Sequence, residues 1–248
     1  MEVLLVAVNF EHINFLRPLS EWRMLDIENL ISLSSGKRYQ SYDSARLLLK
    51  SLERKKIIQI YRDPWNKKNY AFLSKLGEKL IGPDTPSLLQ EETYYHDSKV
   101  SALCYEILKL KHVFHNVELE HKIKNISKKS SFDDIVPDAR VFGQFNDVSF
   151  LSALELELHQ KERGRIITKA KHYLNSTYYN HAFYFFPDKS LMNIYFKAMK
   201  DSLSSDFNQK IFLFAAASIS GSRPNLEKAV GFVSNKEVSF YELFKEGK

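Results

Sequence analysis

Within residues 152–159, leucines alternate with charged or polar residues, and this pattern limits the fold of the chain more than any other segment does. The run reads Ser-Ala-Leu-Glu-Leu-Glu-Leu-His. Successive side chains of a β-strand point to opposite faces, so this period of two predicts a strand with its leucines on one face. The other face then carries Glu155, Glu157 and His159. Two acids this close repel each other and lose hydration on burial, a cost that a bound cation offsets.

A third acid stands near the start of the preceding strand. Residues 135–142 are strand-like, residues 143–147 form a polar turn, and the alternating strand begins at Val148, so the segment predicts a hairpin. Carboxylates grouped in this way suit Mg²⁺ or Mn²⁺, which also bind phosphate oxygens and lower the pKa of a bound water. The hairpin therefore predicts a metal site of Asp138, Glu155 and Glu157, with phosphodiester cleavage as the matching reaction.

A basic helix is expected directly after the acidic strand, over residues 161–173. Its lysines and arginines are candidates for the cation that stabilises charge on an attacked phosphate. Lys169 and Tyr173 share one face of this helix because they are four residues apart.

The other segments of residues 93–248 alternate between helical and strand patterns, which predicts an α/β sheet domain. A helix over residues 96–110 would bury Cys104, and a strand at 113–119 would lead into a loop with Lys122, Lys124, Lys128 and Lys129. The aromatic run at 178–186 indicates a buried central strand in preference to a surface that stacks on unpaired bases. A helix at 190–199 and a buried strand at 211–218 complete the sheet.

The first domain is expected over residues 1–88. Apolar positions at helical spacing predict a helix over 21–33, and Ser41 or Asp43 can cap a second helix. That second helix would bury Ala45, Leu48, Leu49 and Leu52 and turn outward Tyr42, Ser44, Arg46 and Lys50. Residues 57–61 and 69–73 predict a hairpin with a basic tip, residues 74–81 a short helix, and residues 83–95 a linker.

This order of helix, turn, helix and basic hairpin resembles a winged helix-turn-helix. The resemblance implies DNA binding, with the outward side chains of the second helix facing base edges. Phosphates would be neutralised by the hairpin residues Arg62, Lys67 and Lys68. The same arrangement also serves as a protein-docking module, with its charges on a solvated face.

Composition favours a polyanionic partner, because the net charge is +6 and the pI about 9.1. The first 90 residues hold 14 Lys/Arg against 10 Asp/Glu, and the others 22 against 20. The single cysteine rules out an intramolecular disulfide and a Cys-rich zinc site, and with no signal peptide expected it indicates the cytoplasm. No apolar run approaches about 20 residues, so we expect no membrane contact.

Pro137-Asp138 followed by Glu155-Leu156-Glu157 resembles the motifs of the PD-(D/E)XK nuclease superfamily, whose core has a helix, an acid-bearing hairpin, a second helix and a closing strand. The resemblance implies a Mg²⁺- or Mn²⁺-dependent endonuclease, with Glu106 as the acid of the first helix. Most members have lysine where this chain has Glu157. Some restriction enzymes of the superfamily use glutamate there, and others carry the lysine on the next helix, so Lys169 or Lys161 could replace it. Nearly the whole chain is similar to the replication-relaxation family of plasmids and conjugative elements, which implies a role in replication or mobilisation of a mobile element.

Other interpretations stay open. Asp138 could be a hydrogen-bonding turn residue, and Glu155 and Glu157 could pair with lysines of a neighbouring helix on a solvated sheet face. A noncatalytic DNA-binding regulator or relaxosome accessory with a decayed nuclease fold would then be the alternative function, and a protein-protein adaptor a third. A second copy of the chain or other DNA-processing proteins are the expected protein partners.

Overall fold

The computed structural model of the chain describes residues 8–35, 37–81, 89–127, 135–204, 207–221, 223–233 and 236–244. The chain divides into two compact units, Met1–Ser101 and Ala102–Lys248. The sequence predicted domains over 1–88 and 93–248. The division falls within the helix α6 (Tyr94–Ile107).

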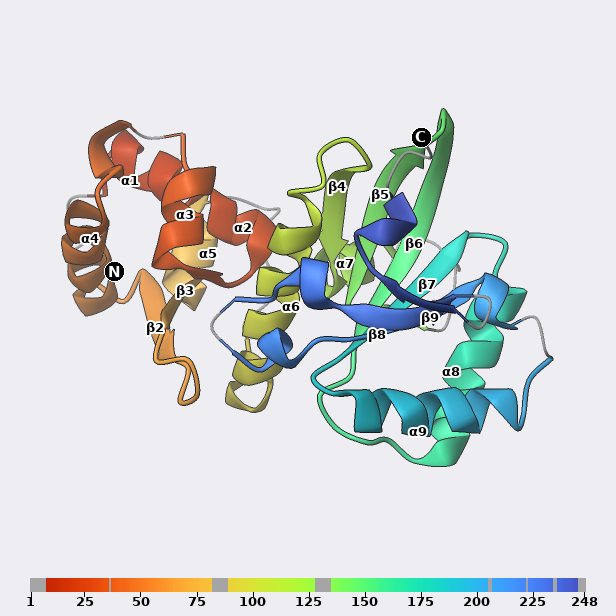
Figure 1. Cartoon of the computed structure of the whole chain (residues 1–248). Coiled ribbons are helices and arrows are strands. Elements are labelled where there is room, and N and C mark those ends of the chain that lie inside the picture. The colour runs from red at the N-terminus through yellow and green to blue at the C-terminus, as the bar shows by residue number, and fades with distance from the viewer. Residues whose placement is uncertain are drawn as a thin grey trace. The chain divides into compact units, whose positions relative to one another are not determined.

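Besides the start of α6, the first unit contains five α-helices and a small antiparallel sheet in its described residues (Figure 1). The helices are α1 (Phe10–Leu16), α2 (Pro18–Trp22), α3 (Ile27–Leu33), α4 (Tyr42–Arg54) and α5 (Lys75–Ile81). The strands are β1 (Leu25–Asp26), β2 (Ile58–Arg62) and β3 (Asn69–Leu73), in the order β1-β3-β2. The predicted hairpin is confirmed, since β2 and β3 pair antiparallel from Ile58↔Leu73 to Arg62↔Asn69.

The helix α4 forms as its sequence predicts. The Ser41 side chain caps it by accepting a hydrogen bond from the Ser44 backbone N–H, which satisfies one of the free donors of the first turn. The expected stripe is buried at Ala45, Leu48, Leu49 and Leu52. This stripe fixes which face of α4 points outward.

The single helix expected over residues 21–33 is wrong. Arg23 has a φ of 60°, which ends α2, and Leu25 and Asp26 pair with β3. Asp26 then starts α3, because its carboxylate accepts a hydrogen bond from the Asn29 backbone N–H. Helical spacing of apolar residues therefore continued across a break that the backbone makes at Arg23.

The second unit is a mixed α/β structure built on a seven-stranded sheet, counted over its described residues. The sheet order is β10-β9-β8-β7-β6-β5-β4, and only the pairs β6–β7 and β7–β8 are parallel. The strands are β4 (Phe114–Leu119), β5 (Ala139–Phe145), β6 (Val148–Leu156), β7 (His181–Phe186), β8 (Ile211–Ala215), β9 (Val230–Val233) and β10 (Lys236–Ser239). The aromatic run forms β7, the buried central strand, as predicted.

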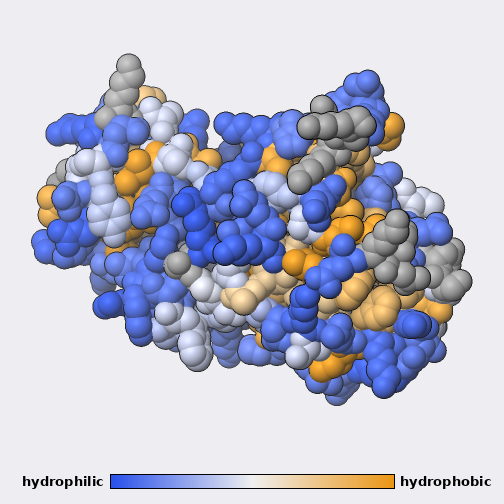
Figure 2. All heavy atoms as spheres, viewed as in Figure 1, coloured by the Kyte–Doolittle hydropathy of each residue, from blue (hydrophilic) through white to orange (hydrophobic). Residues whose placement is uncertain are grey.

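Besides α6, the described helices of this unit are α7 (Glu120–Ser127), α8 (Arg163–Asn175) and α9 (Lys189–Lys200). One face of the sheet packs with α8 and α9 in a single core that includes Ala153, Tyr184, Leu213, Ile166 and Met192. The alternate side chains form an aromatic layer on the other face, with ring contacts among Phe114, Phe183, Phe185, Phe214 and Phe240. Figure 2 shows hydrophobic residues gathered over part of the second unit, around β8 and β9.

Three expectations for the second unit need correction. The helix predicted over 96–110 spans Tyr94–Ile107, and residues 91–95 of the expected linker are helical. Lys122 and Lys124 lie on α7 rather than in a loop, and Lys124 makes a 2.6 Å ion pair with Glu120 one turn away. Lys128 and Lys129, and the linker residues 83–88, lie outside the described residues. No described helix is long and apolar enough to cross a membrane.

The packing of α5 predicts a sensitive glycine. A Cβ at Gly77 would lie 2.1 Å from the Ile57 carbonyl oxygen, so Gly77→Ala should destabilise the first unit by about 1–3 kcal/mol through overpacking. Gly164→Ala on α8 is the matched control, because a Cβ there meets nothing within 4 Å and alanine favours helix. Urea denaturation measures both variants, and an unchanged midpoint for Gly77→Ala would contradict this packing.

Candidate active site

The β5–β6 hairpin brings Asp138 and Glu155 to the same end of two paired strands. Ala139 lies opposite Leu154 in the antiparallel register, so Asp138 stands beside the end of β6. Its Oδ2 accepts a hydrogen bond from the Leu156 backbone N–H at 2.8 Å. This bond holds the Asp138 carboxylate against the strand that carries Glu155.

Glu155 is completely buried, with 0% of its surface exposed, and α8 supplies both of its hydrogen-bonding side chains. Lys169 Nζ lies 2.5 Å from Glu155 Oε2, and the Tyr173 hydroxyl donates to Oε1. These two residues are one helical turn apart, so one face of α8 engages both carboxylate oxygens. The Lys169 side chain is 28% exposed and Asp138 is half-buried, so solvent reaches this group from their side.

Burial dominates the electrostatics of this group. It raises the pKa of Glu155 to about 8, although Lys169 acts to lower it. Burial acts to lower the pKa of Lys169, but attraction to Glu155 and Asp138 outweighs it, so that pKa is raised. Lys169 therefore keeps its positive charge beside the Asp138 and Glu155 carboxyl groups.

Glu157 is also buried but is held by a different helix. It follows the end of β6, its backbone N–H donates to the Phe185 carbonyl at 3.0 Å, and its Oε2 accepts from the Tyr195 hydroxyl of α9 at 3.0 Å. Burial raises the pKa of Glu157, against the attraction of Lys169. The two acids thus have separate hydrogen-bond partners. Glu155 bonds to Lys169 and Tyr173, and Glu157 bonds to Tyr195.

A buried tyrosine adds an unsatisfied hydroxyl to this region. Tyr184 lies opposite Glu155 in the parallel β6–β7 register, and its hydroxyl has no hydrogen-bond partner among the described residues. Burial raises its pKa, and the nearby charges of Glu155 and Glu157 raise it further. Leaving a buried hydroxyl unsatisfied costs about 1–3 kcal/mol, and such groups commonly mark functional sites or bound water.

Asp138 and Glu155 are the two acids of this group that could share a cation. Within the described ranges, no three His, Cys, Asp or Glu side chains converge as a metal-binding group. Mg²⁺ is commonly held by one or two carboxylates and several waters, and the Asp138 and Glu155 carboxyl groups are close enough to influence each other's charge. The two of them could hold such an ion, whereas Glu157 faces Tyr195.

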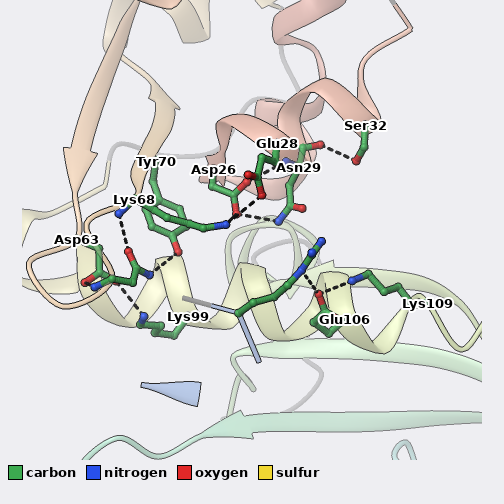
Figure 3. Close-up of polar contacts among 12 residues, drawn as sticks. Asp26, Glu28, Asn29, Ser32, Asp63, Lys68, Tyr70, Lys99, Glu106 and Lys109 are labelled. Carbon is green, nitrogen blue, oxygen red and sulfur yellow. Dashed lines mark hydrogen bonds and ion pairs between the residues drawn. The ribbon is translucent and has the colours of Figure 1, made fainter. Parts of the chain in front are cut away.

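Glu106 lies in a different cluster. Its Oε1 is 2.8 Å from Arg223 Nε and 2.5 Å from Lys109 Nζ (Figure 3). The described contacts of its carboxylate are with these two cations and not with Asp138 or Glu155. The catalytic role that the nuclease resemblance implies for Glu106 gains no geometric support, because Arg223 and Lys109 already neutralise it.

The sequence did not point to Tyr184 or Tyr195 as parts of this site. Tyr184 sits in an aromatic run whose pattern indicates only a buried strand, and the register that sets it beside Glu155 joins strands 29 residues apart. Tyr195 lies on the buried side of α9, where an aromatic residue is ordinary core. Only the tertiary structure places Tyr184 opposite Glu155 and joins the Tyr195 hydroxyl to Glu157.

The residues expected to contact DNA lie in the first unit. On α4, Tyr42, Arg46 and Lys50 are exposed, whereas the Ser44 hydroxyl is bonded to Ser41 at the helix start. In the β2–β3 hairpin, Arg62 and Lys67 are exposed.

Lys68 differs from the other basic residues of the hairpin. Its Nζ lies 3.1 Å from a Glu28 oxygen and 3.8 Å from an Asp26 oxygen, so its charge is already neutralised (Figure 3). The Lys68 ammonium is therefore engaged by two acids of the same unit.

No family model, curated protein or solved structure matches this chain. The function proposed below therefore depends on the geometry of this site and on the motifs in the sequence.

The raised pKa of Glu155 predicts a pH-dependent stability. Folding favours the neutral form of this carboxyl group. The stability that it contributes is therefore fully present below its ordinary pKa of 4.5 and is lost as the pH rises toward about 8. Glu155→Gln cannot ionise, so its stability relative to the wild type should increase over this pH window. Urea denaturation in metal-free buffer at several pH values measures the difference.

The control for this experiment is Glu237→Gln, because Glu237 is 54% exposed and pairs with Lys189 at the surface. Its stability difference from the wild type should stay nearly constant over the same window. Parallel curves of stability against pH for wild type and Glu155→Gln would show that burial does not control the ionisation of this carboxyl group.

Proposed function

We propose that this chain binds DNA and hydrolyses phosphodiester bonds with Mg²⁺ or Mn²⁺ held at Asp138 and Glu155. The observation that carries the proposal is the position of Lys169, whose ammonium from α8 lies 2.5 Å from Glu155. Some members of the nuclease superfamily that this chain resembles carry the lysine on the next helix, and Lys169 lies on the helix that follows Glu157. The order α6, β4, α7, β5–β6 hairpin, α8 and β7 supports a PD-(D/E)XK-like core, with α7 as an additional helix before the hairpin.

The proposed roles follow from the contacts of each side chain. The ion, when bound, would polarise a phosphate oxygen and lower the pKa of a water. Lys169, which is partly exposed, would stabilise negative charge on the phosphate. Tyr173 orients Glu155 by its hydrogen bond, and Tyr195 does the same for Glu157.

Features of the first unit support the proposal that it brings the chain to DNA. Tyr42, Arg46 and Lys50 follow one another at intervals of four residues on α4, so they form one exposed stripe that suits a groove. A hairpin with the exposed cations Arg62 and Lys67 follows in the chain. These features favour a winged helix-turn-helix, and the resemblance to the replication-relaxation family suggests work on the DNA of a plasmid or conjugative element.

Cleavage assays with Mn²⁺ on supercoiled, linear and branched DNA test the catalytic proposal. Asp138→Asn and Lys169→Met should each lower the rate by about 10²-fold or more, because each removes a charge that acts on the phosphate or its cation. Lys171→Met is the matched control on the same helix, since Lys171 is exposed and makes no described contact with the acids. Equal rates for all three variants would exclude this site as the source of activity.

A noncatalytic DNA-binding protein is the second candidate. The full burial of Glu155, with both oxygens engaged by Lys169 and Tyr173, favours it, because such a carboxylate can serve structure alone. Metal-independent DNA retardation without nicking would support this function. Failure to retard any DNA at low salt would instead support a protein-protein adaptor.

Because Lys68 is paired with acids and Lys67 is exposed, we expect the two lysines to contribute differently to DNA affinity. Lys67→Ala should reduce the slope of log affinity against log salt by about 1, because one phosphate contact is lost. Lys68→Ala should change the slope less, since its ammonium already pairs with Glu28 and Asp26. Lys189→Ala, at a surface pair in the second unit, is the control. Fluorescence anisotropy with labelled duplex measures the slopes, and equal effects at Lys67 and Lys68 would contradict the prediction.

A further inference from the structure

The tip of the β2–β3 hairpin, residues 63–68, presents a tryptophan to solvent. Trp65 is 73% exposed, whereas Trp22, the other tryptophan of the chain, is 8% exposed. Tryptophan has a large apolar surface and a flat ring that can stack on a planar ligand. The exposed ring of Trp65 is available for such a contact.

A buried carboxylate organises the hairpin tip. Asp63 is fully buried and accepts hydrogen bonds from the backbone N–H groups of Trp65 at 2.8 Å and Asn66 at 3.2 Å. Lys99 of α6, itself 1% exposed, neutralises Asp63 across 2.9 Å (Figure 3). Burial lowers the pKa of Lys99, while the bond to Asp63 acts in the opposite direction.

The remaining turn residues are also fixed. The Asn66 side chain donates to the Tyr70 hydroxyl at 3.1 Å and accepts from the Lys68 backbone N–H at 2.8 Å. Lys67 adopts a positive φ of 59°. The backbone that carries Trp65 is therefore ordered before any ligand arrives, so that little conformational entropy is lost on binding.

The charge around Trp65 fits a polyanion. Arg62 and Lys67 are exposed beside it in the chain, and the one acid of the tip, Asp63, is buried and neutralised by Lys99. An aromatic ring beside exposed cations is the combination that binds unpaired nucleic acid, because every base has a face on which the ring can stack. A protein partner with an apolar pocket would not need these cations.

We propose that Trp65 stacks on an unpaired base, so that the hairpin tip selects DNA with a single-stranded segment over fully paired DNA. This inference rests on the proposed DNA binding and adds the class of DNA that the chain prefers. Stacking needs no base-specific hydrogen bond, so the preference concerns unpaired structure and not sequence. Junctions, tails and bubbles all offer such bases.

Tryptophan fluorescence, excited at a wavelength that spares tyrosine, tests the proposal directly. Wild type and Trp65→Phe are titrated at low salt with oligo(dT), a tailed duplex and a blunt duplex, and the variant's remaining Trp22 signal is subtracted. Oligo(dT) and the tailed duplex should quench the Trp65 emission by about half or more, and the blunt duplex should leave it nearly unchanged. The full chain is used throughout, and the exposed position of Trp65 makes the variant safe for folding.

Affinity provides the second readout. Trp65→Ala should weaken binding of the tailed duplex by about tenfold, Trp65→Phe should retain most of it, and both should bind the blunt duplex as the wild type does. Tight binding of tailed DNA without quenching, or equal losses on tailed and blunt DNA, would overturn the stacking proposal and leave DNA binding intact. If no DNA is retarded by the wild type, both proposals fail together.

Discussion

The buried Glu155 carboxyl group, held by Lys169 and Tyr173, is the interaction on which the second unit depends. A carboxyl group in the middle of a sheet loses its hydration, and the partners on α8 replace part of what water supplied. They also fix the rotation and the position of α8 along β6, because Lys169 and Tyr173 must reach both oxygens of Glu155 in the same arrangement. The apolar core that includes Ala153 and Ile166 then packs around a helix whose position is already specified.

The first unit uses the same principle for a different purpose. Asp63 and Lys99 form a second buried carboxylate–lysine pair, but both side chains are almost fully enclosed, so this pair orders the hairpin tip and is closed to a ligand. Lys169 is partly exposed and lies near the half-buried Asp138. The difference in access explains why the second pair is a candidate for chemistry and the first for the support of a binding element.

Patterns within short segments predicted much of this fold. The cap and buried stripe of α4, the β2–β3 and β5–β6 hairpins and the central strand β7 all followed from local periodicity and turn residues. The prediction failed where the backbone departs from its pattern, as at Arg23, whose positive φ ends a helix inside a continuous helical spacing. It also failed at α7, where the lysine-rich composition indicated a loop although the segment forms a helix with a Glu120–Lys124 pair one turn apart.

The sequence by itself determined which acids share a strand face and which basic and aromatic residues share a helix face, because these relations depend only on the periods of strand and helix. The tertiary structure decided which partner each acid received. Glu155 bonds to Lys169 and Tyr173, and Glu157 bonds to Tyr195. Glu106 pairs with Arg223, which is 117 residues away in the chain. Those choices depend on strand register and helix packing over long sequence separations, where the cost of desolvating each charge selects the partner.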